Sequence, residues 1–460
     1  MFDKKNKNEN IKNLGEHDAL PSFDMTKYKK NNQNKDNKKL DKVVKDDKAK
    51  SRKNKNLKKE NVEEVDKLII DDLGVNKHKI KMQKNIDFGV KKISYFMLLI
   101  LIIATIVFAV RFIKFNATYM IWRTNVAKGS ENINNKSIKY SLFKNGLMRV
   151  SNDGITYIDT NGVVKWTISY NMKEPIFVSN KNYFAIADKN GNVFYTFNEL
   201  GLVATNTTTN PIEKISISSD GMLYLLQNDE NSSYINLYNN NEKTIETVVE
   251  TTFTEGGIPM DISASNSGEQ LLVCNTCLSG NDVYSKATYY DFSYVDNNSK
   301  KIIGEFIDEF DDKFLARGHF FDDKNSCLIY DGGVIFVSTA DKSNPRITKT
   351  IEFSDMIHAI SYNKKYLALV FDNNVLKVFN NVGNMLCDKK IDFEYESFYL
   401  CEDYEIFLNE NRVMIYDERG RMMLDKELNG SVQYVAKRKN LIFTELLVGF
   451  IDAVECIRFY

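Results

Sequence analysis

From about Asn116 to the end of the chain, apolar and polar residues alternate in short runs. Each run is four to seven residues long, is rich in Val, Ile, Tyr and Phe, and is bounded by Asn, Asp or Gly. Alternation places the apolar side chains on one face of a β-strand, whereas a helix would repeat its apolar positions about every 3.6 residues. The pattern predicts short antiparallel strands joined by tight turns, with almost no helix.

The strand-like runs are grouped in fours. Residues 175–205 read PIFVS, YFAIAD, VFYTFN and LVAT, and the same four-run phrase recurs along the chain. An Asp or Asn stands at the turn between the third and fourth runs, where its side chain can accept hydrogen bonds from the backbone that follows, and a nearby Gly or Asn tolerates a positive φ. These marker residues are Asp159, Asn198, Asn239, Asp296, Asp341, Asn380, Asp417 and Asp452.

The markers are separated by 35 to 45 residues, apart from a gap of 57 residues before Asp296. A period near forty with four strands per unit is typical of a β-propeller. Eight markers predict eight four-stranded blades; seven is the alternative if the copy at Asp452 completes the first sheet. A parallel β-solenoid has shorter rungs, and tandem sandwiches rarely repeat one four-strand phrase. We therefore predict an all-β propeller over residues 137–460, closed by strands near both ends of the domain.

A continuous apolar segment, ISYFMLLILIIATIVFAV, covers Ile93 to Val110 without a charged residue or a proline. As a helix it would measure about 27 Å, close to the hydrocarbon thickness of a bilayer. It begins too far along the chain, and lacks the cleavage site that should follow, to be a signal peptide. We predict one transmembrane helix over residues 91–113, followed by a stalk over 114–136; residues 119–125 are alternatively an extra outer strand.

The charge of the chain changes at this segment. Residues 1–92 contain 26 Lys or Arg and 16 Asp or Glu, whereas the remaining residues contain 36 and 46. The first part is rich in Lys and Asn and poor in apolar residues, so we predict a disordered basic tail over residues 1–90. Six lysines lie in the sixteen residues before the apolar segment and four basic residues in the eighteen after it. The positive-inside rule favours a cytoplasmic tail and an extracytoplasmic propeller at the plasma membrane. We expect no nucleic-acid partner.

Few residues suggest chemistry. Cys274 and Cys277 form an isolated CNTC motif with no second pair and no nearby His, which disfavours a zinc site. The motif continues a strand-like run, whereas a thioredoxin-type pair begins a helix, so we interpret both cysteines as core residues or an incidental disulfide. The four histidines are scattered, and no catalytic triad or metal cluster emerges from their spacing. We predict that the protein is not an enzyme and has no catalytic residue, cofactor or metal.

The wide gap in the fourth unit contains CLSGNDVYSKATYYDF, which lengthens a hairpin. The insertion adds Tyr284, Tyr289 and Tyr290, and aromatic loops on a rigid scaffold are frequent binding elements. We predict that these three tyrosines form an interaction loop. A longer hairpin without a function is the alternative.

The repeat YIDTNGVVKW resembles that of quinoprotein-type and WD40-like propellers, in which an aspartate, a turn glycine and a tryptophan close each blade. The layout of residues 90–460 resembles a family of uncharacterised membrane-anchored propeller proteins of Gram-positive anaerobes, catalogued as a domain of unknown function. The resemblance implies a propeller fold and an envelope location, and it carries no catalytic residue across. With only Trp122 and Trp166 and no adjacent cysteine pair, the chain lacks the features by which quinoprotein dehydrogenases hold their cofactor.

These features predict a single-pass membrane protein whose propeller is an extracytoplasmic interaction scaffold. Its expected partners are the lipid bilayer and an envelope protein or a wall glycan. The alternatives are an enzyme with a site in the propeller funnel, and an envelope sensor that signals through its cytoplasmic tail. Convergent carboxylates, histidines or a metal cluster in the funnel would favour the enzyme, whereas apolar side chains with scattered Lys or Asn would favour the scaffold.

Overall fold

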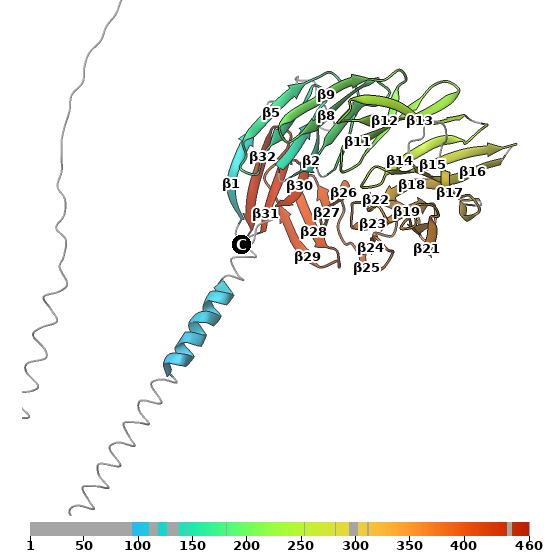
Figure 1. Ribbon diagram of the computed structural model, residues 1–460. Coiled ribbons are helices and arrows are strands. Elements are labelled where there is room, and N and C mark those ends of the chain that lie inside the picture. The colour runs from blue at the N-terminus through green and yellow to red at the C-terminus, as the bar shows by residue number, and fades with distance from the viewer. Residues whose placement is uncertain are drawn as a thin grey trace, which may run out of the picture. The chain divides into compact units, whose positions relative to one another are not determined.

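The computed structural model describes residues 94–109, 118–126, 138–144, 146–180, 182–252, 254–280, 282–293, 302–310, 312–438 and 444–459. The first of these ranges is a helix, and the others form strands and turns (Figure 1). The tail predicted over residues 1–90 lies outside the described residues.

The strands form four-stranded antiparallel sheets, eight of them within the described ranges, which confirms the prediction of an eight-bladed propeller. In seven blades the four strands follow one another along the chain. Blades 1 to 4 comprise β2 (Lys139–Phe143), β3 (Gly146–Val150), β4 (Gly154–Ile158), β5 (Val164–Ser169); β6 (Pro175–Ser179), β7 (Phe184–Asp188), β8 (Val193–Asn198), β9 (Gly201–Thr207); β10 (Ile212–Ile217), β11 (Met222–Asn228), β12 (Ser232–Asn239), β13 (Thr244–Thr252); β14 (Ile258–Ala264), β15 (Gln270–Ser279), β16 (Asp282–Asp291) and β17 (Ile302–Phe306). Blades 5 to 7 comprise β18 (Leu315–Phe320), β19 (Asn325–Tyr330), β20 (Gly333–Ser338), β21 (Arg346–Glu352); β22 (Ile357–Tyr362), β23 (Tyr366–Phe371), β24 (Val375–Asn380), β25 (Met385–Lys390); β26 (Ser397–Cys401), β27 (Tyr404–Asn409), β28 (Arg412–Asp417) and β29 (Met422–Glu427).

The eighth blade is assembled from both ends of the domain. It comprises β30 (Val432–Arg438), β31 (Thr444–Phe450), β32 (Ala453–Phe459) and, outermost, β1 (Thr118–Asn125). Strand β1 pairs antiparallel with β32 and covers an edge that would otherwise be left unpaired. The expected closure by strands near both ends is confirmed. The stalk predicted over residues 114–136 is wrong for 118–125, which form this outer strand.

The ring closes where blade 8 meets blade 1. The Tyr140 hydroxyl in β2 donates a hydrogen bond to the Phe450 carbonyl oxygen at 2.6 Å, and Arg149 Nη2 donates to the Ile451 carbonyl oxygen at 3.2 Å. The ring of Tyr140 stacks on that of Tyr434 in β30, with 6.4 Å between centroids. The first and last blades are thereby neighbours, and the blades surround a common axis (Figure 1).

The marker residues act as the sequence predicts at the turns between third and fourth strands. Asp159 Oδ1 accepts hydrogen bonds from the backbone N–H groups of Asn161 (2.8 Å) and Val163 (2.9 Å), and Gly162 in the same turn has a φ of 80°. The same two-bond arrangement with a following left-handed glycine occurs at Asn380 and Asp417.

Two markers differ from this scheme. Asp296 lies outside the described residues. Asp452 follows β31, so it stands between the second and third strands of blade 8 rather than between the third and fourth. The reason is topological, because the third and fourth strands of this blade come from opposite ends of the domain and no turn joins them.

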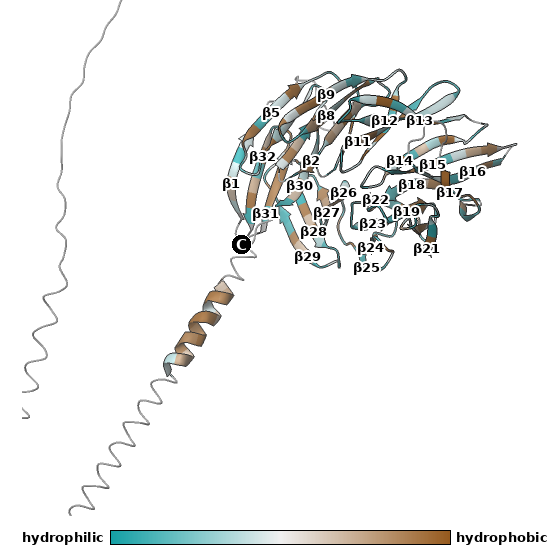
Figure 2. Cartoon of the chain, viewed as in Figure 1, coloured by the Kyte–Doolittle hydropathy of each residue, from teal (hydrophilic) through white to brown (hydrophobic). Residues whose placement is uncertain are grey.

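The helix at residues 94–109 has the sequence SYFMLLILIIATIVFA, without a charged side chain, and Figure 2 colours it brown over most of its length. Its large apolar side chains are exposed. Among the residues that the structure describes, no helix is both long enough and apolar enough to cross a bilayer.

Candidate functional site

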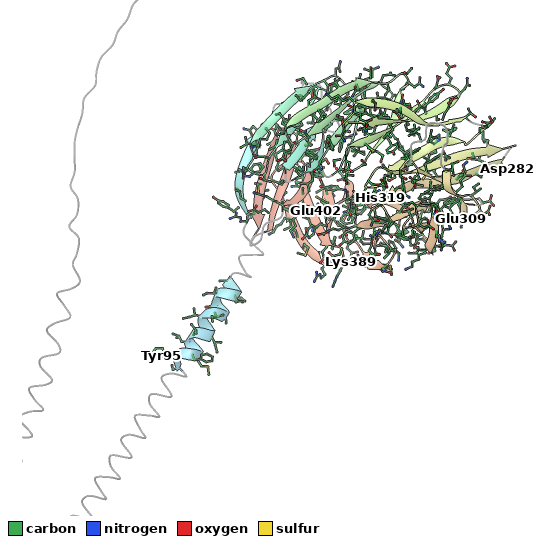
Figure 3. The ribbon with its side chains drawn as sticks, in the orientation of Figure 1. Tyr95, Asp282, Glu309, His319, Lys389 and Glu402 are labelled. Carbon is green, nitrogen blue, oxygen red and sulfur yellow. The ribbon has the colours of Figure 1, made fainter. Side chains whose placement is uncertain are left out.

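The hairpin of β15 and β16 is the longest of its kind among the described strands. Each of its strands has ten residues, whereas the second and third strands of the other blades have five to eight. The two strands pair continuously from Gln270↔Asp291 to Ser279↔Asp282. The insertion predicted in the fourth unit is therefore a regular, extended hairpin. Figure 1 shows β16 reaching beyond its neighbours, and Figure 3 places Asp282 at its far end.

The three predicted interaction tyrosines occupy different parts of this hairpin. Tyr289 and Tyr290 are almost fully buried at its base. The Tyr289 hydroxyl lies 2.9 Å from Ser326 Oγ in blade 5, and its ring packs edge-on against Phe306. Both residues belong to the core, so the prediction that they bind a partner is wrong. Tyr284 is half-buried, opposite Cys277 in the register.

The exposed apolar residues of the hairpin lie nearer its end. Leu278 and Val283 face each other across the two strands, with 50% and 64% of their surfaces exposed. We call residues 278–283 the blade 4 tip. The sequence signal that could have revealed this pair is two apolar residues that flank Ser-Gly-Asn-Asp.

The hairpin is held firmly up to the tip. Ser285 Oγ accepts a hydrogen bond from the Leu315 N–H at 3.0 Å, which joins β16 to the first strand of blade 5. Lys286 Nζ lies 3.0 Å from Glu305 Oε1 in β17. The blade 4 tip is thus an exposed apolar pair on a rigid support.

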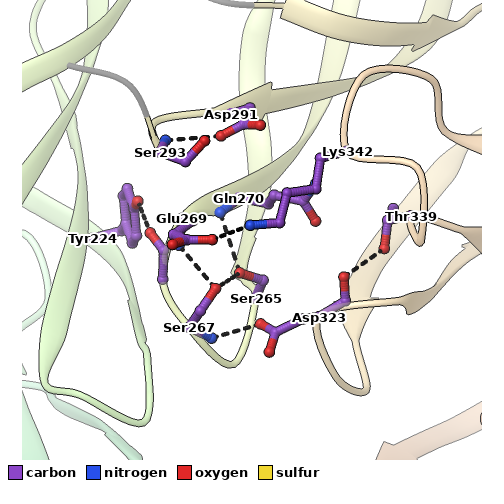
Figure 4. Close-up of polar contacts among 11 residues, drawn as sticks. Tyr224, Ser265, Ser267, Glu269, Gln270, Asp291, Ser293, Asp323, Thr339 and Lys342 are labelled. Atoms are coloured by element: carbon purple, nitrogen blue, oxygen red, sulfur yellow. Dashed lines mark hydrogen bonds and ion pairs between the residues drawn. The ribbon is translucent and has the colours of Figure 1, made fainter.

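The opposite end of the hairpin is tied to both neighbouring blades (Figure 4). The Tyr224 hydroxyl of blade 3 donates a hydrogen bond to the Gly268 carbonyl oxygen, in the turn before β15, at 2.6 Å. The Ser267 N–H of this turn donates to Asp323 Oδ1 of blade 5 at 2.6 Å, and Lys342 forms an ion pair with Glu269. These bonds fix the direction in which the hairpin points.

The first strands of blades 3, 4 and 5 share an ion cluster. Asp261 Oδ1 in β14 lies 2.9 Å from Lys214 Nζ in β10 and 3.6 Å from Arg317 Nη1 in β18. Its other oxygen, Oδ2, accepts a hydrogen bond from the Gly318 N–H at 3.1 Å. A buried carboxylate is costly unless it is paired, and these partners neutralise it. The cluster joins three blades and leaves neither oxygen of Asp261 without a partner.

A second polar network links turns of distant blades. Lys364 Nζ, in the turn between β22 and β23 of blade 6, donates to Asn266 Oδ1 of blade 4 at 2.8 Å and to Ser219 Oγ of blade 3 at 3.3 Å. Because blade 6 is not adjacent to blade 3 in the ring, these bonds bridge across it. The arrangement is of the kind expected for a scaffold, with Lys and Asn side chains that bind protein groups.

The side chain of His319 packs against residues of blade 6. Its ring stacks on Tyr362 with centroids 4.1 Å apart, and Nε2 lies 3.1 Å from the Asn363 carbonyl oxygen. Desolvation by this packing lowers the pKa of His319 to about 4, so the imidazole is neutral at pH 7. Within the ranges that the structure describes, no three or more His, Cys, Asp or Glu side chains are arranged to hold a metal ion.

All six cysteines are buried free thiols. Burial raises the pKa of Cys274 well above its ordinary value and also raises that of Cys277. The interpretation as core residues is confirmed for this pair, and the alternative of a disulfide between them is wrong.

The family model described as "Family of unknown function (DUF5711)" matches residues 117–459. The chain belongs to this family. The DUF5711 match ends with β32 and begins one residue before β1, so it includes the closing strand together with the ring. No curated protein matches the chain.

Solved structures with a similar fold cover most of the chain. BamB from Moraxella catarrhalis is 9% identical with a TM-score of 0.45, covering 75% of this chain and 100% of that one. Sqt1 from Saccharomyces cerevisiae is 9% identical with a TM-score of 0.47, covering 75% and 99%. The computationally designed Ika8 protein is 10% identical with a TM-score of 0.48, covering 73% and 99%. These likenesses are too distant to bear on function, and the assignment of eight blades rests on the strand pairing.

Proposed function

We propose that this protein is an interaction scaffold anchored in the plasma membrane by a single helix, and that its propeller presents the blade 4 tip to a protein of the cell envelope. The exposed Leu278–Val283 pair at the end of the longest hairpin carries the proposal. Contiguous exposed apolar surface on a rigid support marks a binding site, because water contact with such surface is unfavourable until a partner covers it.

The anchor is supported by the composition of the helix at residues 94–109. A helix that is apolar around its whole circumference is stable either inside a protein core or in lipid. The apolar run in the sequence extends from Ile93 to Val110, and eighteen such residues match the thickness of the hydrocarbon layer. The excess of lysines before the run favours a cytoplasmic N-terminus and an extracytoplasmic propeller.

The scaffold is favoured over an enzyme by what the polar side chains do. Asp261, His319 and Lys364, which the sequence scatters over three blades, all bind protein groups that stabilise the ring. Polar side chains whose bonds join separate blades in this way rigidify a fold. Rigidity suits a scaffold, because it lowers the entropy lost when a partner binds.

A protein is a better partner for the tip than a wall glycan. Of the three tyrosines whose flat rings a sugar could stack on, Tyr289 and Tyr290 are buried and Tyr284 is half-buried, and the tip itself offers two aliphatic side chains. Aliphatic side chains are complementary to an apolar pocket, because their burial there removes apolar surface from water.

Crosslinking in intact cells followed by mass spectrometry tests the proposal. The variant Leu278→Ser/Val283→Ser in the full chain should lose the captured envelope protein. The matched control Ile245→Ser/Ile347→Ser changes two exposed apolar residues on the outer strands of blades 3 and 5 and should retain it. Identical neighbours for both variants would contradict the proposal. Deleting residues 1–90 in the same experiment addresses the sensor, since unchanged cytoplasmic neighbours would argue against signalling through the tail.

A further inference from the structure

The turns between third and fourth strands carry exposed apolar residues where polar ones are usual. Such turns favour Gly, Asn, Asp and Ser. Leu200 is nevertheless 91% exposed beside Asn198 in blade 2, and Val382 is 44% exposed at the corresponding position of blade 6. Similar residues flank the turns of other blades. We call the following set the apolar rim: Tyr119, Met120, Val163, Leu200, Val382 and Met422.

The apolar rim is concentrated on one side of the ring. Blades 6, 7, 8, 1 and 2 each carry two large exposed apolar residues at or next to this turn or at the start of the fourth strand. In blades 3 and 5, where the structure describes the whole turn, there is one each. Because blade 8 adjoins blade 1, the five blades are contiguous, and blade 8 is the middle one.

Strand β1 lies in the middle blade of this side. As the fourth strand of blade 8 it begins, at Thr118, on the face where the third-to-fourth turns lie. Trp122 Nε1 confirms this placement, since it donates to the Thr160 carbonyl oxygen in the corresponding turn of blade 1 at 3.2 Å. The chain therefore enters the ring at the middle of the apolar rim.

The length of chain before β1 limits how far the rim can lie from the anchor. Eight residues separate the last described helical residue, Ala109, from Thr118. Fully extended, the nine residue steps from Ala109 to Thr118 span at most about 32 Å. If the helix lies in a bilayer, the start of β1, in the middle of the rim, is held within this distance of the lipid surface. A short tether of this kind makes even a weak contact between rim and lipid populated, because the effective concentration of the rim at the lipid surface is high.

We propose that the apolar rim rests on the surface of the membrane in which the chain is anchored, with its side chains among the lipid headgroups. This inference depends on the membrane anchor of the proposed function. Binding at this depth scales with buried apolar area and with attraction to anionic lipids. Two of the charges nearby are paired, Arg421 with Asp417 at 2.6 Å and Lys165 with Asp159 at 3.0 Å, and these add little to the second contribution.

The contact would also orient the scaffold. The blade 4 tip joins the second and third strands of its blade, so it lies at the opposite end of the third strand from the third-to-fourth turns. With the apolar rim on the lipid, the tip points away from the membrane, toward partners in the envelope.

Lipid quenching of a fluorescent label tests the contact. The native cysteines are buried, so a single exposed cysteine in the full chain can be labelled selectively. Asn161→Cys places the label in the third-to-fourth turn of blade 1, and Asn231→Cys, the matched control, places it in the second-to-third turn of blade 3; both residues are exposed. The labelled chains are reconstituted in phosphatidylcholine vesicles containing doxyl-labelled lipid, with or without phosphatidylglycerol. Flotation of the vesicles reports the anchor independently.

The expected result is co-flotation, with several-fold stronger quenching of the label at 161 than at 231 and little effect of phosphatidylglycerol. Adding Leu200→Ser/Met120→Ser should reduce the quenching at 161, whereas adding Ile245→Ser/Ile347→Ser should not. Co-flotation with equal quenching at the two sites would overturn the rim contact while the anchor stands. Failure to co-float would overturn both the anchor and the rim contact. A shift in emission at 161 without lipid quenching would assign the rim to a second copy of the chain and would also overturn the proposal.

Discussion

The closing blade and the blade 4 hairpin are both built from antiparallel strands, but their side chains differ in what they contact. In blade 8, β1 covers the edge of β32, and its Arg123 Nη1 lies 2.6 Å from Glu455 Oε1 of that strand. At the blade 4 tip, Leu278 and Val283 pair only with each other in the register and face solvent. The difference teaches that ring closure and the exposed apolar pair occupy separate parts of the molecule.

The closing strand is fitted closely to blade 1. A Cβ atom at Gly162 would lie 2.6 Å from the ring of Trp122, so only glycine allows the turn to approach the indole. This glycine also has a positive φ, which other residues rarely adopt. The contact between this turn and Trp122 is therefore specific to these two residue types.

The largest effect should come from Trp122→Ala. Removing the indole takes away its packing against Gly162 and the hydrogen bond to Thr160 and should lower the free energy of unfolding by about 3 kcal/mol. Denaturant titration of the full chain measures the loss. Tyr119→Ala, an exposed position on the same strand, is the control and should change stability by less than about 0.5 kcal/mol. Equal effects would mean that β1 does not hold the ring closed.

A buried acid in blade 7, next to the closing blade, should give a pH-dependent effect. Glu405 in β27 is fully buried, its carboxyl oxygens have no partner outside the residue itself, and burial raises its pKa to about 8. The folded state keeps this proton above the ordinary pKa, so its stabilising contribution is complete below about pH 4.5 and is lost as the pH rises toward about 8.

Glu405→Gln should remove this dependence. Between about pH 6 and about pH 7.5 the unaltered chain should lose about 2 kcal/mol relative to the variant. Thermal unfolding at several pH values measures the difference. Parallel profiles for the two chains would show that Glu405 is ionised in the folded state.

A smaller effect is expected at the turn that contacts the closing strand. Asp159→Ala removes two hydrogen bonds to backbone N–H groups and should cost about 1 kcal/mol. Asp159→Asn keeps an acceptor oxygen, as Asn198 and Asn380 do in their own turns. This variant should therefore cost only a few tenths of the free energy that Asp159→Ala costs. The midpoints of urea denaturation compare the two. If Asn cost as much as Ala, the charge of Asp159 rather than its hydrogen bonding would be responsible.

The smallest effect on stability should come from the blade 4 tip. Leu278→Ser/Val283→Ser, or replacement of residues 278–283 by the two-residue turn Asn-Gly, should leave the free energy of unfolding within about 0.5 kcal/mol of its original value. Removal of 278–286 should cost clearly more, because it also takes away Ser285 and Lys286, which bind Leu315 and Glu305. A large loss from the Asn-Gly replacement would show that the tip belongs to the fold and not to recognition.

Sequence alone predicts those features that depend on local spacing. The turns at Asp159 and Asp417 follow from a side chain that binds its own backbone, so eight repeats imply eight blades. The closing strand could not be assigned in this way, since the partner of Thr118 is Phe459, at the other end of the chain. The same separation explains why Asp452 has a different place from the other markers.

The candidate site was predicted in part, for a similar reason. The insertion in the fourth unit locates the hairpin, but alternation does not tell its buried base from its exposed end. Tyr289 is buried because blade 5 packs against it through Ser326, a contact between residues far apart in the sequence. The exposed pair, Leu278 and Val283, emerges only once the register of the hairpin is known.

Hydrogen–deuterium exchange on the full chain tests the central claim, that residues 118–125 close the ring while the blade 4 tip stays free. Those amides of β1 that donate to β32 should exchange as slowly as the amides of β32, and amides of residues 279–282 should exchange rapidly. Rapid exchange throughout β1, at the rate of the tip and with β32 still protected, would contradict the account, because these residues would then be a stalk outside the propeller.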